Sequence, residues 1–567
     1  GATRAWWDVS ISQMYAPYYG YLPGGAESQN WNYVQDEIDS LGKKGMNGQY
    51  KSAEDYWKGN LRAVELGFTD AVRINLVTLF DRYVANKARF NARMAYGLGD
   101  GFNAWSIRTA DVKPQSGGIR TLRVIQYSTN ENPYSSGWNP VGAKAMESVY
   151  FFDVIEAICD PDSFEAPNDA KDTALRSVYD VKSVKSDLRI AGDAVTGRIP
   201  VPKTALRYDS AAKAWKPVGS GAVSWASGTG SLLPGRWHNG VDMGIDDVLY
   251  ARAFQVEWAT KDGDKDRYYD AAYAESYGDY LASVKGIVLN KDGSLTTYMD
   301  YSFPADPERV AATVCTMRFK AGDPGGWAVV PWDLYEVLGQ LVAEGSKSGT
   351  AYGFAAAKGV AMVDVMDAAC VADIKAKYLE LIEKSFVPAA LRDYVSAESA
   401  VARYKATLAF MEKRGHAFVS NGPFVLAGID AKTRALSLEA FRDYPYASDH
   451  WPARFRTELA RIEAVKAPDA ASRTADAVFE ISAVSFVYPE SGTSPLSETA
   501  SVELRLQLGG GAEKVYAARY EKAGLFVATI PAADMAKLKA GVSYAVVVTA
   551  SLAGGTPTIS LARLSVF

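Results

Sequence analysis

The chain has 567 residues, which is too long for one ordinary hydrophobic core and predicts two to four domains. Hydrophobic residues make up 48% of it and charged residues 22%, as in an average globular protein, so a disordered or coiled-coil chain is excluded. With 61 basic and 66 acidic side chains the net charge is −5, so there is no overall positive field to hold nucleic acid or anionic lipid. Nucleic acid is not an expected partner.

The first predicted elements alternate between helix and strand. Apolar residues recur at helical intervals over residues 53–67, where Gly67 suits the left-handed cap that follows a helix. Residues 71–77 alternate apolar and polar like a half-buried strand, residues 121–127 have an extended pattern, and residues 143–158 have a helical one. This alternation predicts an α/β architecture.

The middle of the chain mixes loops with regular elements. Residues 160–235 are rich in Asp, Ser, Gly, Lys and Pro, which predicts surface loops between short hairpins. A helical pattern returns over residues 247–258, and a turn at Asp292 and Gly293 between two strand-like runs, 286–289 and 295–301, predicts a hairpin. Residues 364–415 have a largely helical pattern that is broken near Pro388.

The carboxy-terminal part differs in character. We expect a helical stretch that ends near Val465, followed by a linker of Ala, Pro, Asp and Ser over residues 466–474. Short alternating runs with Gly and Pro turns then recur over residues 475–567. This spacing is typical of an all-β immunoglobulin-like sandwich, which we interpret as a stalk or spacer.

Three segments together resemble one known family. Residues 235–242 and 246–251 resemble the W-H-x-G and D-D-V-x-Y-A elements of the extracellular solute-binding proteins of family 5, the dipeptide- and oligopeptide-binding type. Residues 420–424 resemble the late G-P-F element of that family. Residues 440–446 with Trp451 resemble the A-F-R-D-x-x-Y…W ending of its long archaeal members. The resemblance spans about residues 1–455.

The resemblance implies a two-lobed periplasmic-binding-protein-like fold of type II over residues 1–465, with two α/β lobes. Family members open with a further amino-terminal segment of the first lobe, so this chain resembles the carboxy-terminal portion of a precursor. Whether the missing segment persists as a separate partner is left open. The implied location is extracellular and associated with the cell surface, held to the membrane only through an anchor that the sequence does not contain.

The function implied by the resemblance is capture of an oligopeptide or oligosaccharide and its delivery to the permease of an ABC importer. An alternative of a different class is a structural cell-surface protein, such as a surface-layer or filament component, built on a solute-binding scaffold. Large exposed apolar patches would favour that alternative.

The sequence offers little support for an enzyme. The histidines, His238, His416 and His450, lack H-x-x-H and H-E-x-x-H spacing, and neither a G-x-S-x-G elbow nor a G-x-x-x-x-G-K-S/T phosphate loop occurs. A pair of glycosidase carboxylates can lie far apart in sequence, so that alternative stays open. The three cysteines have no C-x-x-C spacing, and at most one disulfide is left open, with no preferred pair.

Candidate ligand-binding residues lie in clusters of aromatic and amide side chains. A flat ring can stack on a sugar or clamp a peptide, while neighbouring amides fix the orientation of the ligand. Trp105 and Trp332 are weaker candidates, and for each candidate an anchor in the core or a loop is slightly favoured. The candidates are Trp31, Asn32, Tyr33, Trp105, Tyr134, Trp138, Asn139 and Trp332.

The motif residues themselves are interpreted as architecture. Trp237 and His238 belong to a turn that leads into the next helix, which Asp246 or Asp247 is expected to cap. The segment that contains Asn421, Gly422 and Pro423 is the expected hinge between lobes.

One acidic segment imitates a calcium loop. Asp262, Asp264 and Asp266 alternate as calcium ligands do. Arg267 stands at the position of the turn glycine, however, and Tyr273 stands at that of the bidentate glutamate. We therefore favour a solvated acidic loop and expect no cofactor, with a structural calcium site as the weaker alternative.

Overall fold

The computed structural model describes residues 35–46, 50, 52–70, 84–91, 103–115, 118, 120–125, 133–134, 137–142, 149–166, 171–191, 194–318, 328–488, 492–508, 513–552 and 557–567. The chain divides into two compact units. The first comprises Gly1–Asp81, Val124–Ala166 and Ala170–Ala447; the second comprises Arg82–Arg123, Pro167–Asp169 and Ser448–Phe567. Within the described residues, no helix combines the length and the apolar character needed to cross a membrane.

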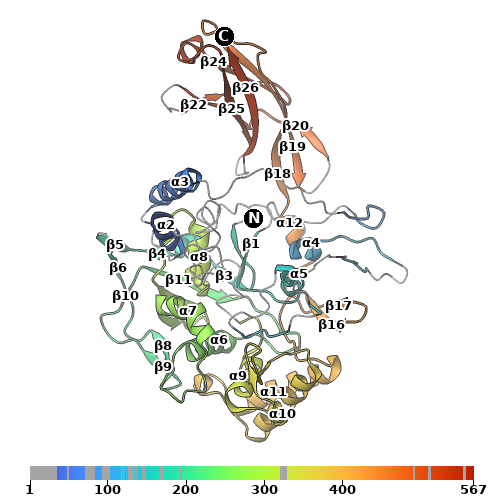
Figure 1. Cartoon of the computed structure of the whole chain (residues 1–567). Coiled ribbons are helices and arrows are strands. Elements are labelled where there is room, and N and C mark those ends of the chain that lie inside the picture. The colour runs from blue at the N-terminus through green and yellow to red at the C-terminus, as the bar shows by residue number, and fades with distance from the viewer. Residues whose placement is uncertain are drawn as a thin grey trace. The chain divides into compact units, whose positions relative to one another are not determined.

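The first unit mixes helices with antiparallel sheets. Helices α9, α10 and α11 lie together at one end of it (Figure 1). The helices are α2 (Asp36–Met46), α3 (Ala53–Asp70), α5 (Val149–Ile158), α6 (Ile245–Ala259), α7 (Ala271–Ser283), α8 (Pro307–Thr316), α9 (Trp332–Glu344), α10 (Ala368–Glu383) and α11 (Ala397–Arg414), with short 3₁₀ turns η1 (Val181–Ser183) and η2 (Ala389–Leu391).

Local chemistry accounts for several of these helix ends. The side chain of Asp306 accepts a hydrogen bond from the amide of Arg309 at the start of α8, where Pro307 occupies the first turn. Ser396 caps α11 in the same way, and Gly415 ends that helix in the left-handed conformation with φ +78°.

The main sheet of the first unit has the strand order β3-β11-β13-β12-β8-β9, and β4 pairs with β11 outside that path. Its pairings are antiparallel, as in Ser227 opposite Tyr298. Helix α8 packs against β11, because Gly228 and Gly230 leave room for it: a Cβ atom at either would lie 2.7 Å from an atom of Cys315. The strands are β3 (Ser177–Tyr179), β4 (Lys185–Ser186), β8 (Leu206–Asp209), β9 (Ala214–Pro217), β11 (Ala226–Leu232), β12 (Val284–Leu289) and β13 (Leu295–Met299).

Shorter strand pairs complete the first unit. All are antiparallel except β14–β15. The pairs are β1 (Ser163–Glu165) with β2 (Asp172–Ala174), β5 (Leu188–Ala191) with β6 (Ala194–Gly197), β7 (Ile199–Pro200) with β10 (Val223–Ser224), β14 (Tyr352–Gly353) with β15 (Ala361–Met362), and β16 (Phe424–Asp430) with β17 (Ala435–Ala440).

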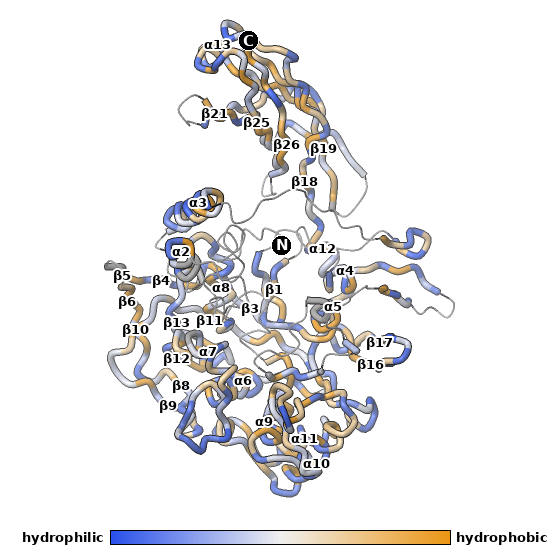
Figure 2. Tube along the Cα trace, viewed as in Figure 1, coloured by the Kyte–Doolittle hydropathy of each residue, from blue (hydrophilic) through white to orange (hydrophobic). Residues whose placement is uncertain are grey.

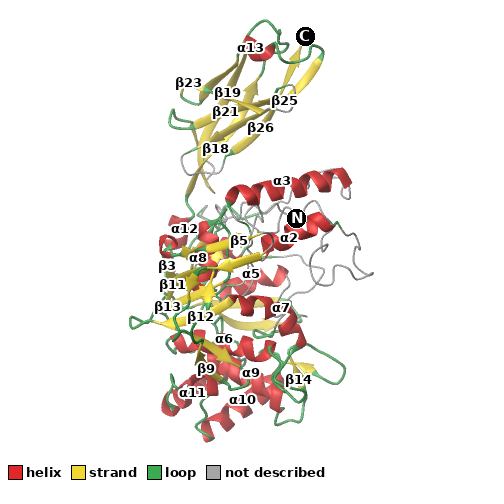
Figure 3. Cartoon of the chain, turned by 90° about the vertical axis from the view of Figure 1, so that its left-hand side faces the viewer, coloured by secondary structure: helices red, strands yellow, loops and turns green. Residues whose placement is uncertain are grey.

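The second unit is mostly β-structure, and from β19 onward its one described helix is the short α13 (Figure 3). One sheet has the order β18-β19-β24-β23 with β20 beside β19, and the other has β22-β21-β25-β26. Its elements are α4 (Ala104–Arg108), α12 (His450–Arg454), β18 (Thr457–Lys466), β19 (Ala477–Tyr488), β20 (Thr493–Pro495), β21 (Ser501–Gln507), β22 (Glu513–Ala517), β23 (Arg519–Lys522), β24 (Leu525–Ile530), α13 (Ala532–Met535), β25 (Val542–Ser551) and β26 (Thr558–Val566).

Each unit has its own hydrophobic core among the described residues. In the second unit, hydrophobic residues follow β19 and β25 (Figure 2), and Phe479 and Val548 are fully buried. The first core is rich in aromatic side chains and includes Trp258, Tyr378 and Phe418. Alternate burial along β25 is the period-two pattern of a strand with one covered face.

Most of the sequence-based elements are confirmed. Helices cover the expected stretches near residues 53–67, 247–258 and 364–415, the last broken before Ala389, and the hairpin at Gly293 is present. Of the helix expected over residues 143–158, the described part, Val149–Ile158, is helical. Alternating strands occupy residues 477–566, and mixed helix and sheet confirm the α/β expectation in its general form. Most strand pairs are antiparallel, however. The strand expected over residues 71–77 lies outside the described residues.

Three local predictions are wrong. Helix α3 continues to Asp70, so Gly67 is buried within the helix and does not cap it. Residues 121–125, the described part of the expected extended segment, form no strand. The expected helix before Val465 is the strand β18, which pairs with β19 and so belongs to the carboxy-terminal sheet. All three cysteines are buried and unbridged.

Candidate functional site

The motif at residues 235–242 and the motif at residues 420–424 meet around one histidine. The backbone amide of His238 donates to the carbonyl oxygen of Ser420 at 2.8 Å. Its ring atom Nε2 lies 3.0 Å from the carbonyl oxygen of Gly422, and its Nδ1 lies 3.3 Å from the amide of Ser420. Backbone and side-chain hydrogen bonds thus join two segments that lie almost two hundred positions apart in sequence. His238 and Ser420 are both buried.

The second motif is also fixed to the end of α5. Asn421 exchanges two hydrogen bonds with the backbone of Asp160, at 2.8 and 3.1 Å. The amide of Gly422 donates to the carbonyl oxygen of Ile158 at 2.8 Å. A Cβ atom on Gly422 would lie 2.4 Å from that same oxygen, so only glycine allows this approach.

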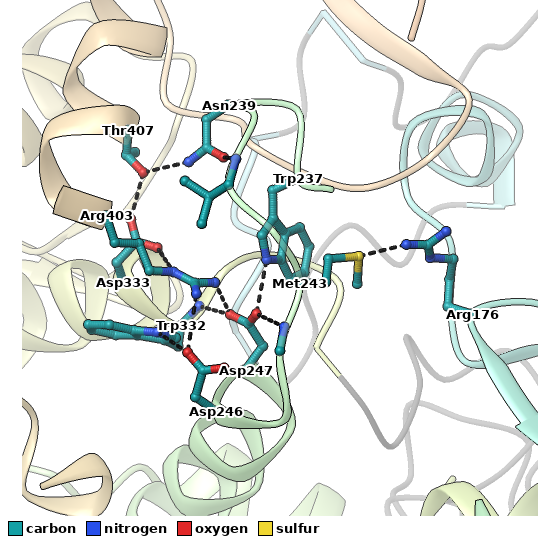
Figure 4. Close-up of polar contacts among 12 residues, drawn as sticks. Arg176, Trp237, Asn239, Met243, Asp246, Asp247, Trp332, Asp333, Arg403 and Thr407 are labelled. Atoms are coloured by element: carbon teal, nitrogen blue, oxygen red, sulfur yellow. Dashed lines mark hydrogen bonds and ion pairs between the residues drawn. The ribbon is translucent and has the colours of Figure 1, made fainter. Parts of the chain in front are cut away.

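A buried polar cluster lies beside this junction and centres on Arg403 (Figure 4). Its guanidinium contacts Asp246 at 3.2 Å, Asp333 at 3.1 Å, and Asp247 through Nη2. The indole of Trp237 donates to Asp247 at 3.0 Å, and the indole of Trp332 donates to Asp246 at 2.9 Å. The cluster therefore ties the motif turn to the first turns of α6 and α9 and to the middle of α11.

The sequence predicts that Asp246 or Asp247 caps α6; the N-cap residue is Gly244, and Asp247 bonds back to it. The carboxylate of Asp247, in the first turn, accepts from the backbone amide of Gly244 at 3.0 Å, which satisfies a free helix-terminal donor. Burial raises the pKa of Asp246, and the neighbouring carboxylate of Asp247 raises it further, while Arg403 lowers it. Burial likewise raises the pKa of Asp333 against the opposing effect of Arg403.

Three of the four described candidate ligand-binding residues of the first unit are buried. The indole of Trp138 donates to the carbonyl oxygen of Pro133 at 3.0 Å, and its ring packs edge-on against Phe418. Asn139 bonds the carbonyl oxygen of Phe354 at 2.8 Å and caps its own turn. Trp332 is fully buried. These side chains serve as structural anchors in this conformation.

The remaining candidates fall into three groups. Tyr134 is half-buried. Trp105 belongs to the second unit, where it packs edge-on against Trp451 and Phe455 at centroid distances of 5.0 and 5.2 Å. Trp31, Asn32 and Tyr33 lie outside the described residues.

Hydrogen bonds between one carboxylate and backbone amides hold the acidic loop. The carboxylate of Asp266 accepts the amides of Asp262 and Tyr268, each at 2.9 Å, while Asp264 extends into solvent. Across the part of the chain that the structure describes, no group of three or more His, Cys, Asp or Glu side chains is placed to hold a metal ion.

A pocket opens between α6, α9 and the β8–β9 hairpin. Its cavity volume is about 120 Å³, below the roughly 300–1,000 Å³ of drug-sized ligand sites, so it has room for a small group only. Residues 386 and 388–390 form a further wall. The lining combines aromatic rings with carboxylates and includes Tyr208, Lys213, Tyr250, Phe254, Glu257, Trp258, Tyr268, Glu336, Gln340 and Glu344.

Hydrogen bonds from tyrosines fix the carboxylates of this pocket. The hydroxyl of Tyr208 donates to Glu257 at 3.1 Å, and that of Tyr268 donates to Glu344 at 2.9 Å. The hydroxyl of Tyr250 donates to the buried Glu336, as does the side-chain amide of Gln340. Burial raises the pKa of Glu336 and of Glu257.

Sequence reasoning missed this pocket, although α9 carried a signal. Asp333, Glu336 and Gln340 recur at intervals of three and four within an otherwise apolar helix, so they share one face. A polar stripe on a buried helix predicts a cluster or a cavity that satisfies it. The partners on the β8–β9 hairpin carry no comparable signal.

No protein-family model matches the chain, and no curated protein matches it. The likeness to solute-binding proteins of family 5 therefore rests on the sequence motifs alone.

Proposed function

We propose that the chain is an exported, non-enzymatic solute-binding protein that captures an oligopeptide or oligosaccharide outside the cell and delivers it to an ABC permease. In this proposal the first unit belongs to a two-lobed solute-binding domain. The carboxy-terminal sheets, from β18 onward, form an immunoglobulin-like sandwich that spaces this domain from the cell surface. A separate amino-terminal fragment of the first lobe is a further proposed partner.

The observation that carries this proposal is the bonding of His238 to Ser420 and Gly422. The W-H-x-G and G-P-F motifs resemble elements of one family, and common ancestry with that family requires both to belong to one folded unit. Their direct contact in the first unit supports that requirement.

Native mass spectrometry of the full chain tests the proposal, after incubation with a mixed tripeptide pool or with a mixed oligosaccharide pool. Retention of discrete peptide or sugar masses on the monomer is the expected result. The Tyr134→Ala variant should lose this retention, whereas Tyr520→Ala, another half-buried tyrosine but in the second unit, should keep it. A monomer that retains neither class of ligand contradicts the proposal.

A structural role at the cell surface is the second candidate, and one observation favours it. Ile559 and Leu561 share the outer face of β26 and are 68% and 72% exposed. Exposed apolar side chains on adjacent positions of one face suit lateral contacts between copies. Large homo-oligomers without ligand in the same spectra would support this role over transport.

A further inference from the structure

The pocket between α6, α9 and the β8–β9 hairpin is strongly acidic. Three glutamates, Glu257, Glu336 and Glu344, line it, and Lys213 is the single cation among its lining residues. Lys377 approaches Glu344 at 3.9 Å but is not part of the lining. Such an excess of carboxylate among aromatic walls favours a positively charged occupant.

Lys213 shows where this pocket stabilises a cation. Its Nζ lies 4.0 Å from the centroid of the Tyr268 ring and 3.3 Å from Oε1 of Glu257. A ring face and a carboxylate are the two groups that hold an alkylammonium in protein sites. The chain's own ammonium therefore occupies the position that a cationic ligand would take.

The side chain of Lys213 can also move out of the pocket into solvent. It lies in the tight turn between β8 and β9 at φ +51°, a conformation that non-glycine residues seldom adopt, and its side chain is half exposed. The turn itself is closed by other groups, since the amide of Ala212 donates to Asp209 at 2.9 Å. Withdrawal of the Lys213 side chain into solvent leaves those bonds intact.

We propose that this pocket binds a small ligand with an alkylammonium group, and that the Lys213 ammonium occupies the ligand position until such a ligand displaces it. The ammonium of the ligand contacts Glu257 and the ring of Tyr268, and its alkyl chain lies against Phe254 and Trp258. Burial raises the pKa of Glu257 and Lys213 opposes that rise, so an incoming cation keeps the carboxylate ionised. This inference concerns the pocket alone and does not depend on the transport role proposed above.

Calorimetric titration of the full chain with n-butylammonium tests the proposal. Removal of the resident cation should tighten binding, so Lys213→Asn is expected to bind n-butylammonium about tenfold more tightly than the unmodified protein. Asparagine tolerates the left-handed turn position. Lys216→Asn is the matched control, because Lys216 pairs with Asp209 on the same hairpin and does not line the pocket. It should leave the affinity unchanged.

Two further titrations test whether the pocket recognises the positive charge of the ligand. Butan-1-ol, which has the same chain without the ammonium, should not bind. Glu257→Gln combined with Lys213→Asn should lose about tenfold in affinity, while Tyr208 can still donate to the amide oxygen. The tripeptide Ala-Lys-Ala and its norleucine analogue show whether a peptide side chain or only a free amine reaches the pocket.

The outcomes are decisive in both directions. Tighter binding by Lys213→Asn that needs Glu257 supports the proposal, with or without peptide binding. Equal affinities for n-butylammonium and butan-1-ol overturn it. The same holds if a folded Lys213→Asn variant, judged by its circular dichroism and melting curve, binds n-butylammonium no better than Lys216→Asn does.

Discussion

The ring of His238 has partners that fit only the neutral imidazole. Its Nε2 donates to the carbonyl oxygen of Gly422, so its Nδ1 must accept from the amide of Ser420. A proton on Nδ1 would turn this acceptor into a donor that faces another donor. Burial lowers the pKa of His238 to about 4, and Gly422 only partly offsets this effect.

This arrangement predicts a pH-dependent stability. The histidine pKa in the unfolded chain is about 6.5, so between about pH 6.5 and pH 4 the unfolded state binds more protons than the folded state. The contribution of neutral His238 is complete above this window and is lost as the pH falls through it, by about 2 to 3 kcal/mol. Urea unfolding at about pH 7.5 and about pH 4.5 measures the loss.

The His238→Gln variant should lack this part of the pH dependence, although it starts from a lower stability at neutral pH. The control is His450→Gln, because His450 is exposed. That variant should lose stability on acidification as the unmodified protein does. An equal loss in all three proteins would show that His238 does not carry the effect.

Gly422 leads to a second residue-scale prediction. A methyl group at this position would press on the carbonyl oxygen of Ile158, a backbone atom that cannot move aside without breaking its own hydrogen bond with the amide of Gly422. Gly422→Ala should therefore lower the free energy of unfolding by about 2 kcal/mol, as forced overpacking does. Urea denaturation curves measure this change.

Gly428 provides the matched control for that variant. It lies in β16 a few residues further on, and a Cβ atom there meets nothing within 4 Å. Gly428→Ala should change the stability by less than about 0.5 kcal/mol. If both variants behave alike, the close approach at Gly422 does not limit the structure.

At the scale of elements, Arg403 joins three helices. It lies on α11 and neutralises Asp246 and Asp247 from α6 and Asp333 from α9. Asp333 is also bonded by the hydroxyls of Tyr378 and Thr407, at 3.0 and 2.6 Å. The positions of α6 and α9 that line the pocket begin one turn beyond these aspartates, so the cluster fixes the pocket walls.

Removal of this guanidinium should be costly. Arg403→Met leaves buried carboxylates without a counter-charge, which typically lowers stability by about 3 to 5 kcal/mol. Arg414→Met is the control on the same helix, because Arg414 pairs with the exposed Glu439 and such surface pairs contribute less than about 1 kcal/mol. Thermal melts of the two variants compare them, and equal shifts would contradict a central role for Arg403.

The same scale shows what sequence patterns can and cannot predict. The hairpin at Gly293 and helix α6 follow from local period and turn chemistry, and both are present. The sequence of strand β18 predicts a helix, because its Ala, Leu, Glu and Arg residues favour helices and a bulge between Ile462 and Ala464 breaks its alternation. Pairing with β19 overrides that local preference.

The candidate sites divide in the same way. The interpretation of His238 and Asp247 as architecture fits their contacts, because each carries its own turn or cap chemistry. The hinge expected at Asn421, Gly422 and Pro423 stays a prediction. The polar face of α9 is the one local signal of the acidic pocket, because Lys213 and Glu257 come from a hairpin and a helix with no local pattern that pairs them. Contacts between residues so far apart in sequence depend on the whole fold.

At the scale of the whole molecule, local sequence patterns do not predict how the chain divides into two units. Residues 82–123 belong to the second unit, although the first unit lies on both sides of them in sequence. Trp105 joins Trp451 and Phe455 there, and Phe90 pairs with Val112. Nothing in the composition of this segment predicts that it belongs with strands that begin more than three hundred residues later.

The two units have separate hydrophobic cores in the described part of the chain, so cooperative unfolding should be confined to each of them. Scanning calorimetry of the full chain is expected to show two transitions. Phe479→Ala removes a fully buried ring from the second core and should lower the midpoint of one transition only, by several degrees. Leu338→Ala, equally buried in the first core, should lower only the other. Because each variant is the control for its partner, a common shift of both transitions would mean that the two cores unfold as one cooperative system.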